Sequence, residues 1–411
     1  MNVHLQKSEV KNQELKVTIT GSKSETNRLL LLQALYSNLT IDNISNSDDS
    51  EVMQKALKVL SEKSATVDVH HAGTAMRFLT AFFAIQEEKE IVLTGSSRMK
   101  ERPIKILVEA LQQLGAEISY AENEGYPPIQ IKGKKLTQNK VSLPANVSSQ
   151  YISALLLIAP KLENGLELTL EGEITSVPYI KMTLALLNEI GIETSFENNK
   201  ITVCHAKLVE ATRLTVESDW SSVSYWYSIV ALSEIGTQIT LSSYKKNSLQ
   251  GDAALSEIYK DFGVETLFNE NNTITISKTK NCQLSIVNYQ LNNCPDIAQT
   301  IAVTCFGLGI GCDLYGLHTL KIKETDRLEA LKTELTKLGA AISVTNESLH
   351  LKPSTSINEN IAIKTYQDHR MAMAFAPLAL RVPIIIEEAE VVSKSYPDFW
   401  NDLKSVGFQI E

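Results

Sequence analysis

The chain has 411 residues, of which 43% are hydrophobic and 21% are charged, and its net charge is −9 at pH 7. This length is enough for two domains, and the composition is ordinary for a globular protein. The negative charge disfavours nucleic acid as a partner, because duplex binding usually shows a basic face, but it does not disfavour a small anionic substrate.

The sequence also bears on membranes, export and thiols. No apolar stretch reaches the ~20 residues of a membrane span, and we see no export signal at Met1. The five cysteines have no zinc-ligand spacing, and their odd number argues against a disulfide framework. We therefore expect a cytoplasmic protein with reduced thiols and no membrane partner.

The first predicted helix follows the segment GSKSETNR at residues 21–28. A helix start leaves backbone N–H groups unpaired and carries partial positive charge, to which Lys23 and Arg28 add full charges. Ser22 and Ser24 can cap the helix or donate hydrogen bonds. The segment predicts a seat for an anion such as phosphate. The alternative is an ordinary serine-capped helix with a solvated lysine.

The same pattern recurs along the chain. Apolar helices with small, polar or charged starts are also predicted near residues 73, 148, 220, 295 and 368. A second, amphipathic helix follows each, and most of these end in an apolar residue and Gly, as at Leu114-Gly115, which suits the left-handed position that stops a helix. We predict six α/β repeats of ~70 residues, too long for a solenoid. The first is shortened, with room between Arg28 and His71 for one helix and a strand or two.

A basic segment, RMKERP at 98–103, follows a strand predicted over 91–94 and opens a further helix. Its arginines offer planar forks that bind carboxylate or phosphate at two points. Pro103 suits the first position of a helix. The alternative is a basic surface turn.

The densest charged segment, KIKETDR, covers residues 321–327 and precedes a helix predicted over 328–337, with Thr325 or Asp326 as its cap. In the functional interpretation, Glu324 relays a proton while the neighbouring cations hold anions. A carboxylate surrounded by cations is a weak base at rest, but it can act when the substrate changes its surroundings. The alternative is a surface held together by salt bridges.

Other motifs exclude several classes of chemistry. His369 beside Asp368 could suggest a catalytic triad, but the chain has no Gly-x-Ser-x-Gly elbow to supply the nucleophile. The pairs His70-His71 and Cys204-His205 are poor zinc sites. The sequence has no phosphate-loop motif and no dinucleotide motif. We therefore expect neither a metal nor another cofactor.

Nine segments, in order and at compatible spacings, carry a resemblance over essentially the whole chain. They are GSKSETNR (21–28), AGTAMR (72–77), RMKERP (98–103), SSQ (148–150), SVPYI (176–180), PD (295–296), KETDR (323–327), DHRMAM (368–373) and KSYPDF (394–399). The chain resembles the EPSP synthase (3-phosphoshikimate 1-carboxyvinyltransferase) family. The resemblance implies an α/β protein of two domains with three βαβαββ-type units each, the inside-out α/β barrel of the enolpyruvyl transferase fold. Residues 21–216 would form one domain and residues 1–20 plus 217–411 the other, with the active site in the cleft between them.

The resemblance also implies a reaction. The family transfers the enolpyruvyl group of phosphoenolpyruvate to the 5-hydroxyl of shikimate 3-phosphate and releases phosphate, by addition and elimination through a tetrahedral intermediate. This step belongs to the shikimate pathway, which leads to chorismate and the aromatic amino acids, and it needs no cofactor. We expect a monomer that glyphosate inhibits.

The motifs place the family's functional residues on this chain. For shikimate 3-phosphate they imply Lys23, Ser24, Arg28, Ser148, Ser149, Gln150, Ser176, Tyr179, Asp296, Thr319 and Lys323. For phosphoenolpyruvate they imply Lys23, Gly73, Arg102, Gln150, Arg327, Arg370 and Lys394. Asp296 would take the proton of the reacting hydroxyl, and Glu324, Lys323 and Lys23 would move protons at the methylene carbon and the leaving phosphate. His71, Phe78 and Thr319 depart from the residues usual in the family.

Three other functions compete with this interpretation. The sister enzyme, which transfers enolpyruvyl to UDP-N-acetylglucosamine, usually has a reactive loop cysteine in its second unit, and this chain has no cysteine before Cys204. A non-catalytic ligand-binding relative would have lost some of the residues Lys23, Arg102, Asp296, Glu324 or Arg370, and all are present. A nucleic-acid end-processing enzyme is disfavoured by the charge and by the missing nucleotide motifs.

Overall fold

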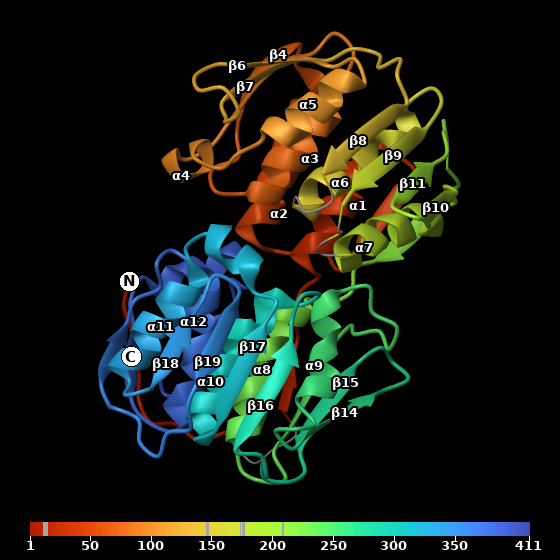
Figure 1. The fold of residues 1–411 in the computed structure, drawn as a ribbon. Helices are drawn as coiled ribbons and strands as arrows, with labels where there is room; N and C mark the ends of the chain where they lie inside the picture. The colour runs from red at the N-terminus through yellow and green to blue at the C-terminus, as the bar shows by residue number, and fades with distance from the viewer. Residues whose placement is uncertain (11–14, 145–147, 173, 175–176, 208) are drawn as a thin grey trace. The chain divides into compact units, whose positions relative to one another are not determined.

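The chain folds into two compact units. The computed structural model describes residues 1–10, 15–144, 148–172, 174, 177–207 and 209–411. Gly21–Val216 form one unit, called the contiguous unit here, and Met1–Thr20 with Glu217–Glu411 form the other, called the split unit (Figure 1). The chain therefore passes from one unit to the other twice.

The described strands of the contiguous unit form two four-stranded sheets and one two-stranded sheet. The first has the order β4-β5-β7-β6, with β4 (Ser64–Asp68), β5 (Glu90–Thr94), β6 (Glu117–Tyr120) and β7 (Ile129–Lys132). The second has the order β10-β11-β9-β8, with β8 (Lys140–Pro144), β9 (Leu166–Glu171), β10 (Thr194–Glu197) and β11 (Lys200–Val203). The third pairs β3 (Leu39–Asp42) with β12 (Thr212–Thr215).

In the split unit, the strands of the described residues form two four-stranded sheets and one three-stranded sheet. One has the order β14-β15-β13-β2, with β2 (Leu15–Val17), β13 (Gln238–Leu241), β14 (Val264–Phe268) and β15 (Ile274–Lys278). The next has the order β16-β17-β19-β18, with β16 (Ile286–Gln290), β17 (Gly311–Tyr315), β18 (Ile342–Val344) and β19 (Ser348–Leu351). The third has the order β1-β21-β20, with β1 (Val3–Leu5), β20 (Ile361–Ile363) and β21 (Ile384–Ile386).

The helices alternate with these strands along the chain. The contiguous unit has α1 (Lys23–Leu35), α2 (Asp48–Leu57), α3 (Gly73–Ala84), α4 (Ser97–Lys100), α5 (Lys105–Gln113), α6 (Ser149–Ile158) and α7 (Val177–Glu189), with short 3₁₀ helices η1 (Lys58–Ser61) and η2 (Ala159–Lys161). The split unit has α8 (Trp220–Leu232), α9 (Leu255–Ile258), α10 (Ala298–Leu308), α11 (Arg327–Lys337), α12 (His369–Phe375) and α13 (Phe399–Val406). Its 3₁₀ helices are η3 (Gly251–Ala254), η4 (Pro295–Ile297), η5 (His318–Ile322), η6 (Ala376–Leu380) and η7 (Ala389–Lys394).

One strand pattern repeats in the four-stranded sheets. Strands β4 and β5 are parallel, with Val67 opposite Leu93, and the chain crosses between them through α3. It then passes through α5 and returns along β6 and β7, and β7 is antiparallel to both β5 and β6. Strands β16 to β19 repeat this with α10 as the crossover. A parallel pair needs such a crossover, and a hairpin does not. The predicted βαβαββ fold class is therefore confirmed.

Strands from distant parts of the chain complete three of the sheets. The shortened first repeat supplies β3, and β12 joins it in parallel, with Thr212 opposite Leu39. Near the N-terminus, β2 pairs in parallel with β13, and β1 pairs antiparallel with β21, where Leu5 lies opposite Ile384. The strands β1 and β2 thus belong to sheets whose other strands come much later in the sequence.

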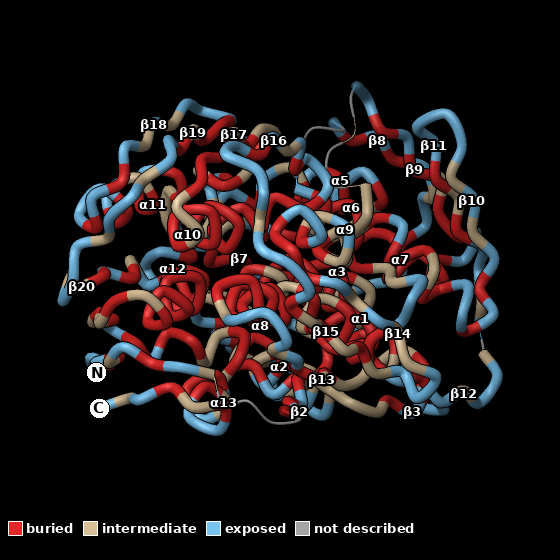
Figure 2. Tube along the Cα trace, turned by 90° about the horizontal axis from the view of Figure 1, so that it is seen from below, coloured by how far each residue is buried: buried red, intermediate tan, exposed pale blue. Residues whose placement is uncertain are grey.

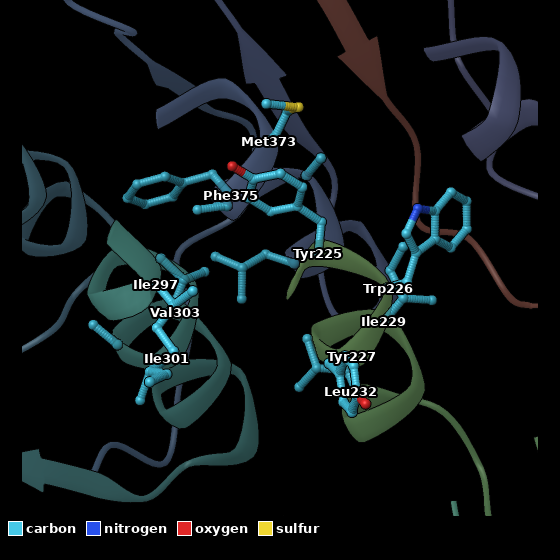
Figure 3. Close-up of a cluster of buried hydrophobic side chains, with 14 of the residues drawn as sticks. Tyr225, Trp226, Tyr227, Ile229, Leu232, Ile297, Ile301, Val303, Met373 and Phe375 are labelled. Carbon is cyan, nitrogen blue, oxygen red and sulfur yellow. The ribbon is translucent and has the colours of Figure 1, made fainter. Parts of the chain in front are cut away.

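The crossover helices form the interior of each unit. In the split unit, every residue of α8 except Ser221 is buried, and α12 is buried throughout (Figure 2). A helix that is apolar on all sides is stable only inside a protein. Figure 3 shows side chains of α8, α10 and α12, among them Tyr225, Val303 and Phe375, gathered in one cluster. Among the residues placed in the structure, we find no helix whose length and apolar character would let it span a bilayer.

Side chains fix the starts of several helices. Ser148 accepts the N–H of Gln150 at the start of α6. Asp326, one of the two caps predicted for α11, accepts the N–H of Glu329. A side-chain acceptor at this position satisfies an otherwise unpaired backbone donor. Ser22 stands at the N-cap position of α1, but its side chain makes no capping hydrogen bond to the helix.

The second, amphipathic helices end as predicted, at glycines with positive φ, such as Gly115 (101°) and Gly339 (100°). The helix start predicted at Pro103 is wrong, because Pro103 lies between α4 and α5, and α5 begins at Lys105. The carbonyl of Pro103 instead accepts hydrogen bonds from Arg77 and Tyr151, which hold this connection in place.

Candidate active site

The starts of three buried helices of the split unit meet around Arg370, the second residue of α12. Its Nη1 donates to the main-chain oxygen of Asp296 at 3.2 Å, and its Nη2 donates to Ser221 Oγ at 3.1 Å. Nη2 also lies 3.5 Å from Asp296 Oδ2. Ser221 is in the first turn of α8, and Asp296 is in η4, immediately before α10. One guanidinium therefore joins all three helix starts.

A second buried guanidinium, that of Arg327, binds three carboxylates. Its Nη1 donates to Asp296 Oδ1 at 2.8 Å, its Nη2 to Glu324 Oε2 at 2.7 Å, and its Nε to Asp368 Oδ2 at 2.6 Å. Arg327 is only 2% exposed, and burial alone would lower its pKa. The three carboxylates reverse that effect and raise the pKa of Arg327 above its usual value. Arg327 thus holds these acids in a fixed arrangement.

Asp296 is the carboxylate on which the cations converge. It is 8% exposed, and Lys323 Nζ lies 3.4 Å from Oδ1, in addition to the contacts with Arg327 and Arg370. Burial would raise the pKa of Asp296, but Lys323, Arg370 and Arg327 together hold it well below its usual range. Asp296 is therefore ionised and a weak base at rest. The Glu324 side chain is more open, with 28% of its surface exposed.

The loop before α12 has a strained backbone. Tyr366 and Gln367 have φ values of 54° and 57°, which cost free energy for residues with a Cβ. Tyr366 Oη donates to Glu334 Oε1 at 2.6 Å, and Lys394 Nζ donates to the Gln367 carbonyl at 2.7 Å. These bonds hold the loop that delivers Asp368 and Arg370, so Lys394 joins the group through Gln367.

In the contiguous unit, polar contacts join the starts of α1, α3 and α6. Lys23 Nζ lies 3.5 Å from Asp49 Oδ2, and His71 Nε2 lies 3.8 Å from the other oxygen of that carboxylate. Gln150 Nε2 donates to Thr74 Oγ1 at 3.2 Å. Asp49 of α2 therefore lies between Lys23 and the loop that leads into α3, and Gln150 links α6 to the same helix start.

Arg102 lies directly over Gly73. A Cβ atom built on Gly73 would stand 2.5 Å from Arg102 Nη1, so a side chain at this position would force the guanidinium to move. Arg77 donates to the carbonyls of Gly73 and Pro103, both at 3.1 Å. Burial chiefly, and then the charge of Arg102, lower the pKa of Arg77 to about 10. No carboxylate pairs with Arg102 in the described part of the chain, which favours an anionic ligand here.

Arg28 is buried and bound by the protein itself. Its Nε donates to Thr183 Oγ1 at 2.8 Å, and its Nη1 donates to the carbonyl of Ser24 at 2.7 Å. Its guanidinium lies 5.3 Å from the ring centre of Phe78 and 5.9 Å from that of Tyr179. The departure at Phe78 thus supplies an aromatic face for Arg28. Burial lowers the pKa of Arg28 to about 10.

The other expected substrate residues are less closely joined. Ser148 is exposed and Ser149 is buried at the start of α6. Thr319 lies on η5, and its Oγ1 is buried with no hydrogen-bond partner among the described residues. Ser176 lies outside the residues that the structure describes. No group of three or more His, Cys, Asp or Glu side chains that could hold a metal ion occurs in the described ranges.

Sequence reasoning did not identify four residues that contact the predicted ones directly or, for Asp252, through Ser221. Asp368 binds Arg327 and also accepts the N–H of Arg370 as the cap of α12, and Asp49 contacts Lys23. An aspartate at a helix start was the available signal for both, because it can cap the helix and still bind a cation. Ser221 and Asp252, which are hydrogen-bonded to each other, had no such signal.

Comparison with solved structures identifies the fold. EPSP synthase from Acinetobacter baumannii superimposes with a TM-score of 0.81 at 20% identity, over 100% of this chain and 99% of that one. The enolpyruvyl transferase NikO from Streptomyces tendae gives a TM-score of 0.77 at 13% identity, over 100% and 98%. The fold is that of the enolpyruvyl transferases.

Sequence similarity identifies the family within this fold. Residues 60–403 match the family described as EPSP synthase (3-phosphoshikimate 1-carboxyvinyltransferase). The 3-phosphoshikimate 1-carboxyvinyltransferase of Bacteroides fragilis (strain YCH46) is 45% identical over 404 residues, 97% of each chain. That of Haemophilus influenzae (strain KW20) is 35% identical over 423 aligned positions, 95% of this chain and 96% of the relative. The chain belongs to the EPSP synthase family.

Proposed function

We propose that this chain transfers the enolpyruvyl group of phosphoenolpyruvate to the 5-hydroxyl of shikimate 3-phosphate and releases phosphate, in the shikimate pathway. The observation that carries the proposal is the cluster of Asp296 with Lys323, Arg327 and Arg370, in a chain that belongs to this family. A buried carboxylate among three cations suits a reaction between two phosphorylated anions, one of which must lose a hydroxyl proton.

The contiguous unit supplies most of the proposed contacts to shikimate 3-phosphate. We assign its phosphate to Lys23, Ser148, Ser149 and Ser176, and the rest of the molecule to Ser24, Arg28, Gln150 and Tyr179, with Asp296, Thr319 and Lys323 from the split unit. The start of α6 supports this assignment, because it places two serine side chains at the positive end of a helix. Each charge-assisted hydrogen bond contributes about 1.5–3 kcal/mol.

Both units supply residues for phosphoenolpyruvate in the proposal. Arg102, Gly73, Gln150 and Lys23 come from the contiguous unit, and Arg327, Arg370 and Lys394 come from the split unit. Arg102 supports the assignment for two reasons. It lies over Gly73, and no carboxylate pairs with it in the described ranges. We further propose that the two sets bind the same pair of substrates.

The charges around Asp296 explain how a weak base could act at the right moment. When phosphoenolpyruvate attracts Lys323 and Arg370, Asp296 loses part of the attraction that keeps its pKa low. Asp296 then takes the 5-hydroxyl proton as the C–O bond to phosphoenolpyruvate forms. The methylene carbon gains a proton in this addition and loses one in the elimination that releases phosphate. We assign these transfers to Glu324, Lys323 and Lys23.

Phosphate release tests this proposal against the alternatives. The enzyme is mixed with phosphoenolpyruvate and either shikimate 3-phosphate or UDP-N-acetylglucosamine, in buffer with a chelator. We expect phosphate only with shikimate 3-phosphate. Release with the sugar nucleotide instead would assign the sister activity. No release with either would leave a ligand-binding relative, to be characterised by calorimetry with each ligand.

The cellular setting follows from the same proposal. We propose a monomer in the cytoplasm, where small phosphorylated metabolites are the substrates. All five cysteines are free in the structure, which suits a reducing compartment. Sedimentation of the purified protein at several concentrations tests the monomer.

A further inference from the structure

We propose that Ser221 and Asp252 act as a positioning pair that fixes the guanidinium of Arg370 for phosphoenolpyruvate. This inference rests on the proposed function and adds two positioning residues to it. All three residues lie in the split unit, on three different elements: α8, η3 and α12.

The hydrogen bonds give the pair a direction. Ser221 Oγ donates its proton to Asp252 Oδ2, and the same oxygen accepts Arg370 Nη2–H at 3.1 Å. A serine hydroxyl has one proton, so once it is given to Asp252 the oxygen can only accept from Arg370. Without Asp252, the hydroxyl could rotate and turn its proton toward the guanidinium. Asp252 therefore keeps Ser221 in the orientation that Arg370 needs.

The position of Ser221 on its helix supports this role. It is the residue of α8 that is not buried, and it lies in the first turn, where the helix start meets Arg370. Arg370 Nη1 is held by the main-chain oxygen of Asp296. Nε of Arg370 is buried and has no hydrogen-bond partner among the described residues. The protein thus holds the two Nη atoms and leaves donor capacity on the guanidinium, as a preorganised anion site requires.

The burial of the Asp252 carboxylate costs folding free energy. It is 5% exposed, and burial chiefly, then the charge of Asp296, raise its pKa to about 6. Besides Asp296, the titratable groups that affect it or lie beside it are Arg370, Asp219 at the α8 cap, and Cys294. A buried carboxylate next to another carboxylate destabilises the fold, so a functional role for its hydrogen bond to Ser221 would explain why the chain has one here.

Steady-state kinetics of four variants test the pair. Ser221→Ala should raise KM for phosphoenolpyruvate about 10-fold, the loss of one hydrogen bond to a charged group. Asp252→Ala should also raise this KM, but by less, because it removes a negative charge that repels the anion. KM for shikimate 3-phosphate should stay within about twofold. Asp252→Asn should keep KM for phosphoenolpyruvate at or below the wild-type value, because its amide oxygen still accepts from Ser221. Ser224→Ala is the matched control: the hydroxyl of Ser224 bonds to the Ser221 carbonyl and Thr300.

A pH profile tests whether the Asp252 carboxylate acts on the phosphoenolpyruvate site. At each pH, the KM of the wild type for phosphoenolpyruvate is divided by the KM of Asp252→Asn. Because both proteins meet the same substrate, its own titration does not affect this ratio. It should rise from about 1 near pH 5 to a plateau above pH 7, because the wild-type carboxylate then repels the anion. A flat ratio would mean that the Asp252 carboxylate has no influence on the phosphoenolpyruvate site. A merely structural residue would also give the same KM for phosphoenolpyruvate in Asp252→Ala and Asp252→Asn, whereas a positioning residue is rescued only in Asp252→Asn.

Two outcomes would overturn the pair. One is an unchanged KM for phosphoenolpyruvate in Ser221→Ala and Asp252→Ala. The other is an equal rise in KM for both substrates with no rescue by Asp252→Asn. Either result leaves wild-type turnover, and so the proposed function, intact. If the wild type itself releases no phosphate, the proposed function fails, and calorimetric titration of wild type and Ser221→Ala with phosphoenolpyruvate still tests the pair.

Discussion

Asp296 shows how a single side chain can be both a structural anchor and a proposed base. Three cations lie within 3.5 Å of its carboxylate oxygens, and they lower its pKa although burial opposes them. Removing the whole side chain would leave buried cations facing one another. A test of its chemistry therefore needs a substitution that keeps its size and an acceptor oxygen.

Asp296→Asn meets that need. We expect turnover to fall about 10²–10⁴-fold, the usual contribution of a general base, while the dissociation constant for shikimate 3-phosphate changes little. Single-turnover kinetics and calorimetry measure the two quantities. If Asp296→Asn instead lowers the thermal midpoint so far that unfolding accounts for the lost activity, Asp296 is chiefly structural.

The close approach of Arg102 to Gly73 makes a second residue-scale prediction. Glyphosate should inhibit the wild type, and Gly73→Ala should weaken that inhibition, because the new methyl group would displace the guanidinium. KM for phosphoenolpyruvate should rise about 10-fold, the value of one charge-assisted contact. The half-inhibitory glyphosate concentration, measured at fixed phosphoenolpyruvate, checks the effect. An uninhibited wild type would contradict the assignment of Gly73.

Asp252 should make stability depend on pH. Its pKa is raised to about 6 in the folded chain, against about 4 for an exposed aspartate, so the folded state binds the proton more tightly. Its stabilising contribution is full below pH 4 and is lost as pH rises through 6. Relative to Asp252→Asn, wild-type stability should thus fall by about 1–3 kcal/mol between pH 4 and 7. Urea denaturation of both proteins across this range measures it, and a constant difference would contradict it.

The sequence predicted the residues that stand in ordered motifs and missed those that only the fold brings together. Asp296, Glu324 and Arg327 were identified from their motifs, and the structure places them in contact. Ser221 and Asp252 are separated by 31 positions, and a serine in the first turn of a helix is common enough to carry no signal. Pairing between separate elements is the information that local patterns lack.

At the scale of elements, helix starts were easier to predict than connections. The cap at Asp326 and the stop at Gly339 follow from local backbone chemistry, which the sequence shows directly. Pro103 misled because proline suits a helix start and also a connection without backbone donors. Its carbonyl, which Arg77 and Tyr151 bind, decides between the two, and that depends on tertiary contacts.

The cap of α11 provides an element-scale prediction. Asp326→Ala removes the acceptor for the Glu329 N–H and should lower the free energy of unfolding by about 1 kcal/mol. Asp326→Asn is the control, since it keeps an acceptor and loses only the charge that faces Lys321 at 3.5 Å. Urea denaturation compares the two. Equal losses in both variants would mean that the ion pair, and not the cap, is responsible.

At the scale of the whole molecule, the proposed phosphoenolpyruvate residues are divided between the units. Arg102 belongs to the contiguous unit, and Arg327 and Arg370 belong to the split unit. Because both sets are assigned to the same substrates, we expect shikimate 3-phosphate to draw the units together. The radius of gyration from small-angle scattering should fall when it is added. Phosphate alone is the control, and an unchanged radius with saturating substrate would refute closure.

The repeated architecture was predictable because similar helix-start motifs recur at regular intervals along the sequence. The shortened first repeat was also predictable, because few residues lie between Arg28 and His71 in the sequence. The strands that close sheets from a distance were not predicted. β1, β2 and β12 are three or four residues long, and nothing in so short a pattern names a partner.

The strands β1, β2 and β12 determine the order in which the sheets can form during synthesis. The contiguous unit can complete its sheets once residue 216 has left the ribosome, since β12 is its last strand. Residues 1–20 emerge earlier, yet β2 waits for β13 and β1 waits for β21. An unpaired strand invites wrong partners. Both waiting strands are three residues long with a polar residue at the centre, His4 or Lys16, so the nascent chain exposes little that another strand could capture.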